Sequence, residues 1–227
     1  SIARSNLSCS RATSDSRPWN DAIDDAHLQV VRGGASFLAE CAAALVDLGA
    51  SGVLSPPLPT AAQQLWKQAA FTPYVSLRLL RRSLDAVPPP DHAIGEGSHA
   101  DLEEALRIDT AAFDGFWRFD RTALLEALNS TRISKLHLIR NPQGGLAGFA
   151  ITGVGSAHAY LQRVAVDPPW QGRGLGRSLV RISARWAKQQ GARTTLLNTQ
   201  TDNLSAIHLY ESEGYTALRE PLEVLRR

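Results

Sequence analysis

The chain has 227 residues, of which 44% are hydrophobic and 20% are charged. This balance is typical of a globular protein and excludes a disordered or collagen-like chain. The formal net charge of +2 gives no electrostatic reason to expect nucleic acid or an anionic membrane as a partner.

Cysteine usage and the absence of long apolar runs narrow the class further. Two cysteines, Cys9 and Cys41, are too few for a disulfide framework, and no Cys/His cluster has metal-ligand spacing, so no metal is expected. No run of 18 apolar residues predicts a membrane span, and the first 30 residues lack the apolar stretch of a signal peptide. We therefore expect a cytoplasmic protein, and the many alanines and few lysines favour a bacterial source with a GC-rich genome.

The N-terminal part of the chain alternates helix and strand signals. A helix is expected over about 35–47, because Gly49 follows it as a helix-ending glycine. A short strand follows, then the pair Leu65-Trp66 and the run 77–82. Residues 86–98 combine three prolines with two glycines, which is typical of a linker. The predicted organisation is therefore an N-terminal segment 1–88, a linker 89–98 and a C-terminal domain 99–227.

The C-terminal part predicts a mixed α/β sheet domain. Apolar periodicity indicates helices over about 101–113, 121–128, 174–190 and 203–212. Apolar runs indicate strands over 135–140, 147–153, 159–166 and 194–197, with one or two more in 215–225. The turn 141–145, with its asparagine, proline and glycines, joins the first two strands as a hairpin.

A glycine-rich loop lies between the third of these strands and the helix from 174. Glycines at 172, 174 and 176 allow backbone amides to converge on one anion, and a helix N-terminus adds partial positive charge. The loop therefore suits a phosphate or pyrophosphate. It is not a Walker loop, because no lysine follows. It is not a dinucleotide fingerprint either, because Arg177 replaces the third glycine and residues 196–198 hold no carboxylate.

Two motifs resemble those of the GCN5-related N-acetyltransferase (GNAT) superfamily. The first is Gln171-Gly-Arg-Gly-Leu-Gly176 after a strand, and the second is Asn203-Leu-Ser-Ala-Ile-His-Leu-Tyr210 followed by Gly214-Tyr215. The subgroup most similar by motif is the ribosomal-protein alanine acetyltransferase type. The resemblance implies a mixed, mostly antiparallel sheet with splayed central strands flanked by helices. It also implies direct transfer of an acetyl group from acetyl-CoA to a primary amine, with a protein lysine or N-terminal amine favoured.

The resemblance also assigns roles to residues. Tyr210 matches the tyrosine that protonates the departing thiolate, and Asn203 would contact the cofactor through its side chain. The strand backbone would bind the pantetheine arm, and one of its amides would polarise the thioester carbonyl. These strand residues are Val164, Ala165 and Val166. The pyrophosphate would lie on Gln171, Gly172, Arg173, Gly174, Leu175, Gly176 and Arg177.

The general base departs from the family pattern. The two positions where the family carries a glutamate hold Asn198 and Tyr160 here. A water chain ordered by these two side chains could remove the amine proton, or Asp114 or Asp120 could do so. The segment between the first two helices lines the acceptor site in this fold. Its acidic residues and the aromatic pair Phe116 and Trp117 suit a cationic amine, although the aromatic residues could equally be core.

The N-terminal segment resembles the second half of the same fold. The run 77–82 matches 222–227, and Gly34 corresponds to Gly176. Only Arg32-Gly33 separates Val31 from Gly34, so the phosphate loop is missing, and the upstream chain is expected to be too short for the first strands. We therefore expect a degenerate half-GNAT segment that does not bind CoA. It would pack on the catalytic half, shape the acceptor groove or make a homodimer.

Two further functions stay open at this point. One is acetylation of a small-molecule amine, as in the mycothiol-type tandem acetyltransferases, which also have a degenerate N-terminal half. The other is a non-catalytic acyl-CoA-binding sensor, suggested by the missing carboxylates at Asn198 and Tyr160.

Overall fold

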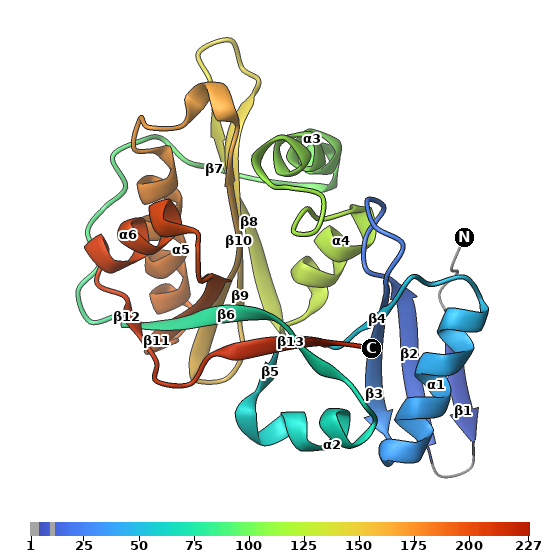
Figure 1. The fold of residues 1–227 in the computed structure, drawn as a ribbon. Helices are drawn as coiled ribbons and strands as arrows, with labels where there is room; N and C mark the ends of the chain where they lie inside the picture. Colours follow the sequence, from blue (N-terminus) through green and yellow to red (C-terminus); the bar gives the residue numbers. More distant parts are fainter. Residues whose placement is uncertain (1–4, 10–11) are drawn as a thin grey trace. The chain divides into compact units, whose positions relative to one another are not determined.

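The computed structural model describes residues 5–9 and 12–227 (Figure 1). The chain divides into two compact units, one made of residues 1–78 with 219–227 and the other of residues 79–218. This division lies ahead of the predicted linker 89–98 and places the last strand, β13 (Leu222–Arg226), in the first unit. The reason is hydrogen bonding, because β13 pairs with β4 and with residues 72–77 of β6.

The first unit opens with an antiparallel meander of β1 (Ser5–Cys9), β2 (Ala12–Pro18) and β3 (Ala26–Arg32). The predicted helix is confirmed as α1 (Ala35–Asp47), and β4 (Val53–Leu54) returns parallel to β3. The remaining elements are β5 (Leu58–Pro59), a 3-10 turn (Thr60–Ala62), α2 (Gln63–Gln68) and β6 (Thr72–Ser83).

The expectation that the chain ahead of residue 35 is too short for strands is therefore wrong. The sequence of β2 gave no strand signal, because apolar and polar residues do not alternate along it. Its inward positions are serines, Ser14 and Ser16, which are each 1% exposed, and Ser14 Oγ lies 3.5 Å from the Sγ atom of the buried Cys41. The side chain of Cys9 lies outside the described ones. Leu28, Leu38 and Phe71 belong to the core of this unit.

The second unit confirms the predicted order of helices and strands, with ends that differ by no more than three residues. It contains β7 (Gly95–Glu96), a 3-10 turn (His99–Asp101), α3 (Leu102–Ala112), α4 (Arg121–Asn129), β8 (Ile133–Arg140), β9 (Leu146–Val154) and β10 (His158–Val166). After a 3-10 turn (Pro168–Trp170) come α5 (Leu175–Gln189), β11 (Thr194–Gln200), α6 (Leu204–Ser212) and β12 (Thr216–Ala217).

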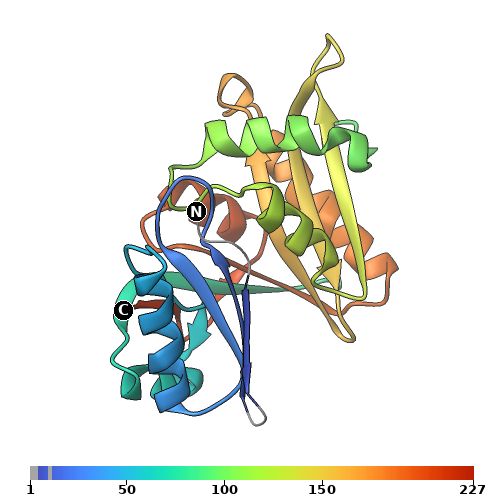
Figure 2. The same cartoon turned by 90° about the vertical axis from the view of Figure 1, so that its right-hand side faces the viewer.

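The sheet of this unit runs in the order β6, β11, β10, β9, β8, β7. Strands β7 to β10 pair antiparallel and β10 and β11 pair parallel, so the expected mixed, mostly antiparallel sheet is confirmed. Helices α3 and α4 cover one face of β8–β10, and α5 covers the other (Figures 1 and 2). This two-sided cover explains why every residue of β9 is buried.

The two units share one order of elements. Each has a three-stranded antiparallel meander, a helix, a strand parallel to the last meander strand, and a second helix. The link between meander and helix differs, because two residues, Gly33 and Gly34, join β3 to α1 whereas residues 167–174 join β10 to α5. No described helix is long and apolar enough to cross a membrane.

A buried histidine makes the second unit sensitive to acid. His137 of β8 is 4% exposed, its Nε2 atom has no hydrogen-bond partner among the described residues, and its ring lies 5.9 Å from that of Trp186. Burial, with a smaller effect of Lys135, lowers the pKa of His137 from 6.5 to about 4. The unfolded chain therefore binds this proton more readily, so its contribution to stability is complete above pH 6.5 and is lost as the pH falls towards 4.

We expect His137→Leu to flatten this pH dependence. Between pH 7 and 4.5 the wild type should lose about 2 to 3 kcal/mol more of its unfolding free energy than the variant. Urea unfolding at several pH values measures the difference. His27→Leu is the matched control for the first unit, because burial also lowers the pKa of His27 to about 4. Equal pH slopes for wild type and His137→Leu would contradict the prediction.

Candidate active site

The strands β10 and β11 separate at the centre of the second unit. Residues 158–160 of β10 pair with residues 194–196 of β11, and the pairing ends there although β10 continues to Val166 and β11 to Gln200. On its other edge β10 carries a bulge against β9 between Leu161 and Arg163. Splayed parallel strands leave main-chain donors and acceptors available to a ligand. The predicted pantetheine residues 164–166 lie on this separated stretch.

The loop after β10 is shaped by glycine and by its own hydrogen bonds. Gly172 and Gly174 have φ of 74° and 81°, a left-handed conformation in which other residues are strained. Gly174 is the N-cap of α5. The Gln171 side chain turns back, and its Nε2 donates to the carbonyl oxygen of Val166 at 3.0 Å. Gln171 therefore acts on the conformation of the loop.

The loop leaves a continuous run of backbone donors. Within the described chain, the N–H groups of residues 172–177 donate no hydrogen bond. These N–H groups lie at the N-terminus of a 15-residue helix, where the helix dipole favours an anion. The arrangement fits a group with several anionic oxygens, such as a diphosphate.

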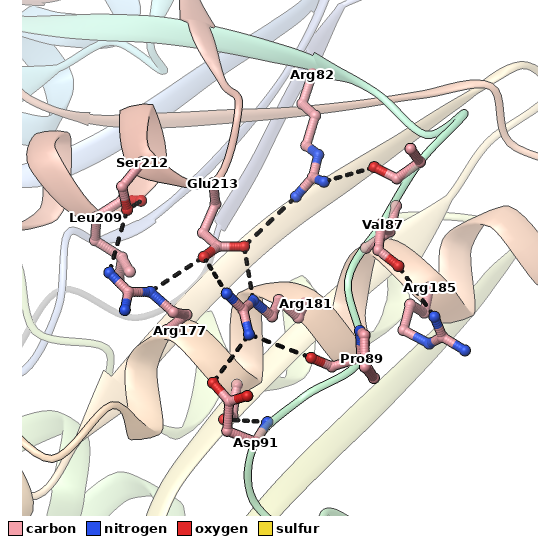
Figure 3. Close-up of polar contacts among 12 residues, drawn as sticks. Arg82, Val87, Pro89, Asp91, Arg177, Arg181, Arg185, Leu209, Ser212 and Glu213 are labelled. Atoms are coloured by element: carbon pink, nitrogen blue, oxygen red, sulfur yellow. Dashed lines mark hydrogen bonds and ion pairs between the residues drawn. The ribbon is translucent and has the colours of Figure 1, made fainter.

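The arginine side chains of this region are already engaged. Arg173 stacks on Trp170, with its Cζ atom 4.7 Å from the ring centroid. Arg177 Nε lies 3.1 Å from Glu213, and Arg181 pairs with both oxygens of the same carboxylate at 2.9 and 3.0 Å (Figure 3). The Glu213 side chain is only 3% exposed. Arg177 lies in the first turn of α5. Its N–H group belongs to the predicted phosphate-binding run, and its side chain is directed to Glu213.

Tyr210 lies on α6, the helix that Asn203 caps by accepting a hydrogen bond from the Ala206 N–H at 3.2 Å. The tyrosine is 9% exposed, and its ring lies 5.8 Å from that of Tyr215. Burial raises the pKa of Tyr210 to about 12, and the positive charge of Arg163 partly opposes this. The phenol therefore keeps its proton at neutral pH, as a general acid must.

The two positions that lack the family glutamate lie on one face of the splayed strands. Tyr160 pairs in register with Leu196, and Asn198 is two residues further along β11. Side chains two residues apart on a strand share a face, so Tyr160 and Asn198 project to the same side. Both are exposed, with Tyr160 at 41%. The structure brings them to one solvent-accessible face, where water can reach them.

The predicted acceptor residues lie on the α3–α4 connection, and both carboxylates there hold the backbone. Asp114 Oδ1 accepts from the N–H groups of Phe116 and Trp117, each at 3.1 Å. Asp120 is the N-cap of α4 and accepts from the Ala123 N–H at 2.7 Å. Phe116 and Trp117 are half-buried and contact each other edge to face, with ring centroids 4.8 Å apart.

An ion pair that the sequence analysis did not single out joins these parts. Arg163 donates to the carboxylate of Asp109 through Nε and Nη2 at 2.6 and 2.7 Å, and to the Trp117 carbonyl oxygen at 2.9 Å. Its guanidinium lies between the rings of Phe113 and Phe119, 3.5 and 4.0 Å from their centroids. Asp109 is 0% exposed. The pair therefore holds the α3–α4 connection against the bulge of β10.

Comparison with known proteins agrees with this arrangement. A sequence profile of the Acetyltransferase (GNAT) family matches residues 102–215. Mycothiol acetyltransferase from Mycolicibacterium paratuberculosis is 31% identical over 226 residues, which cover 82% of this chain and 66% of that protein. The [Ribosomal protein bS18]-alanine N-acetyltransferase of Escherichia coli is 42% identical over 72 residues, 32% of this chain and 49% of that enzyme. The chain thus spans about two thirds of the length of the mycothiol acetyltransferase it matches.

The fold is also found in solved structures. A tandem GNAT protein from the clavulanic acid biosynthesis pathway superposes with a TM-score of 0.67. The match covers 96% of this chain and 78% of that one, at 11% sequence identity. At this identity the likeness concerns the fold alone.

Proposed function

Because the chain belongs to the acetyltransferase (GNAT) family, we propose that it transfers the acetyl group of acetyl-CoA directly to a primary amine in a ternary complex. The observation that carries the proposal is the pair of main-chain features around β10. Residues 164–166 lie beyond the paired stretch of β10 and β11, and the N–H groups of 172–177 donate no hydrogen bond within the described chain. Together they suit a ligand with an amide-rich arm and a diphosphate.

In this proposal the main chain of Val164 to Val166 binds the pantetheine arm. One of these N–H groups donates to the thioester carbonyl oxygen and stabilises the negative charge that develops there during attack. The N–H groups from Gly172 to Arg177 hold the diphosphate, and Asn203 lies at the start of α6 beside the ligand.

Tyr210 supplies the proton for the leaving group. Attack of the amine nitrogen on the thioester carbon forms the new C–N bond and breaks the C–S bond. The sulfur then takes the phenolic proton of Tyr210. A proton from solvent afterwards restores the neutral phenol. The raised pKa keeps the phenol protonated until the thiolate forms.

The amine must lose a proton before or during attack. Tyr160 and Asn198 share an exposed face of β10 and β11, and we assign them the ordering of a water that accepts this proton. Asp114 and Asp120 are less suited as bases, because one oxygen of each carboxylate already accepts backbone N–H groups. Their role is to shape the acceptor side together with Phe116 and Trp117.

The acceptor proposed first is a small-molecule primary amine. This choice is supported by the mycothiol acetyltransferases, whose similarity extends over 82% of this chain in the M. paratuberculosis enzyme. A protein N-terminal amine or lysine is the second candidate, supported by 42% identity to the bS18-alanine enzyme over 72 residues. Both acceptor classes and acetyl-CoA would meet the enzyme in the cytoplasm.

We also propose that the first unit is a degenerate copy of the second. Their common order of elements supports this, and the two-residue link Gly33-Gly34 leaves no room for a phosphate loop. The first unit would then contribute packing, acceptor selection or a homodimer contact rather than a second acyl-CoA site.

The proposed function is tested by release of free thiol from acetyl-CoA with pooled acceptors: small amines, peptide N-termini and lysine peptides. We expect release with the small-amine pool. Thiol release only with a peptide pool would indicate that the acceptor is a protein amine. Tight binding of acetyl-CoA without thiol release in any pool would indicate a non-catalytic acyl-CoA sensor and contradict the proposed reaction.

We expect Gly174→Ala to weaken acetyl-CoA binding about tenfold. A side chain at φ 81° is strained by about 1–2 kcal/mol, which the loop relieves by turning its N–H groups away from the diphosphate. The added Cβ would also lie 3.5 Å from the His92 ring. Isothermal titration measures the dissociation constant.

Gly191→Ala is the matched control. Gly191 has φ of 89° just beyond the other end of α5, and a Cβ there would meet no atom within 4 Å. This variant should show similar backbone strain with unchanged acetyl-CoA affinity. Equal acetyl-CoA affinities for wild type and Gly174→Ala would show that the loop does not bind acetyl-CoA.

A further inference from the structure

Residues 85–92, which overlap the predicted linker, lie along helix α5 and are called the strap below. Successive turns of α5 hold its main chain (Figure 3). Lys188 Nζ donates to the Asp85 carbonyl oxygen at 2.5 Å, and Arg185 donates to that of Val87 at 3.0 Å. Arg181 donates to that of Pro89 at 3.3 Å. The strap therefore runs antiparallel to α5, from its C-terminus towards its N-terminus.

The strap is fixed most firmly near the start of α5. Arg181 pairs with the Asp91 carboxylate at 2.9 Å, and the Asp91 N–H donates to Ser178 Oγ at 3.1 Å (Figure 3). Ser178 is 0% exposed, so its hydroxyl is a built attachment point. Three prolines restrict the backbone of the strap at 88–90. The residue that follows is thus delivered to a defined place.

His92 follows Asp91 at the end of the strap. Its Nδ1 atom lies 2.9 Å from Ser178 Oγ, and its Nε2 atom has no partner among the described residues. The ring adjoins the glycine loop, because a Cβ built on Gly174 would lie 3.5 Å from His92 Cε1. Ser178 Oγ accepts the Asp91 N–H, and when it donates its own proton to Nδ1, the ring proton is on Nε2.

We propose that His92 is a ligand-binding residue whose Nε2–H donates to the diphosphate of the acyl-CoA held by residues 172–177. This inference rests on the proposed function. The function of the strap is then to hold His92 beside the glycine loop. It adds a side-chain donor to a site that is otherwise built from main-chain N–H groups, and it favours acyl donors that carry the diphosphate.

The test compares His92→Phe and His92→Gln with two ligands. Acetyl-CoA carries the diphosphate, and S-acetylpantetheine is the same thioester without any phosphate. Equilibrium titration followed by NMR gives a dissociation constant for each, including weak binding of the truncated ligand. Thermal unfolding of each variant shows that it is folded.

For His92→Phe we expect the dissociation constant of acetyl-CoA to rise about tenfold, while that of S-acetylpantetheine stays unchanged. His92→Gln, which retains an N–H donor, should recover most of the loss. Unchanged acetyl-CoA affinity in His92→Phe, or equal weakening of both ligands, would overturn the proposal.

The two proposals fail in different ways. Thiol release is measured separately on the same preparations. Phosphate-dependent loss of binding in His92→Phe, together with no thiol release by the wild type, would retain the His92 contact and overturn the transfer reaction. Thiol release by the wild type with no change in His92→Phe would do the opposite.

Discussion

Tyr210→Phe is expected to lower kcat about 100-fold and to leave the KM for acetyl-CoA unchanged. The substitution keeps the buried ring and its edge contact with Tyr215, and removes only the hydroxyl. Without that proton the leaving group departs as a bare thiolate. Single-turnover measurement of thiol release at saturating amine gives the rate of the chemical step.

Tyr215→Phe is the matched control. Its hydroxyl is buried beside Thr195, and burial raises the pKa of Tyr215. Removing it should leave kcat within about twofold, because this hydroxyl has no part in the proposed transfer. If Tyr210→Phe retained the wild-type rate, another group would have to protonate the sulfur.

Asp109→Ala is expected to lower the free energy of unfolding of the second unit by about 3 to 5 kcal/mol. The substitution leaves the Arg163 guanidinium without its two carboxylate contacts, in a place that is nearly closed to water. It also removes the acceptor for the Phe119 N–H, which lies 2.6 Å from Asp109 Oδ1. Chemical unfolding at pH 7 measures the loss.

The double variant Asp109→Leu with Arg163→Met separates charge burial from packing. Replacing both partners of a buried ion pair by apolar residues is often close to neutral, so most of the lost stability should return. We expect the double variant to stay slow in catalysis, because the α3–α4 connection loses its tie to Trp117. A loss below about 1 kcal/mol in Asp109→Ala would show that the pair does not hold this connection.

Local signals predicted the second unit well. The hairpin at 141–145, the helix from 175 and the glycine loop each depend on residues close in sequence, where periodicity, turn residues and helix ends act directly. The asparagine at 203 and the tyrosine at 210 were singled out by the resemblance to the GNAT motif, and the structure places both at the helix α6, as its N-cap and on its buried side.

Features that depend on distant residues were less visible. Asp109 lies on the buried side of α3 beside Ile108, and a charge at that position was an available signal, yet its partner is 54 residues away on a bulge. The strap was interpreted as a linker, because its attachment uses carbonyl oxygens that any sequence would offer. The strand β2 was missed because serines fill its inward positions.

The place of β13 between β4 and β6 has a consequence for biosynthesis. A ribosome synthesises residues 222–226 only after residues 79–218. Until then, the edges of β4 and β6 that pair with β13 have no partner strand. Such edges are templates for wrong pairing with other chains. Completion of the first unit therefore depends on a strand that is made after the second unit, which couples the maturation of the first unit to translation of the second.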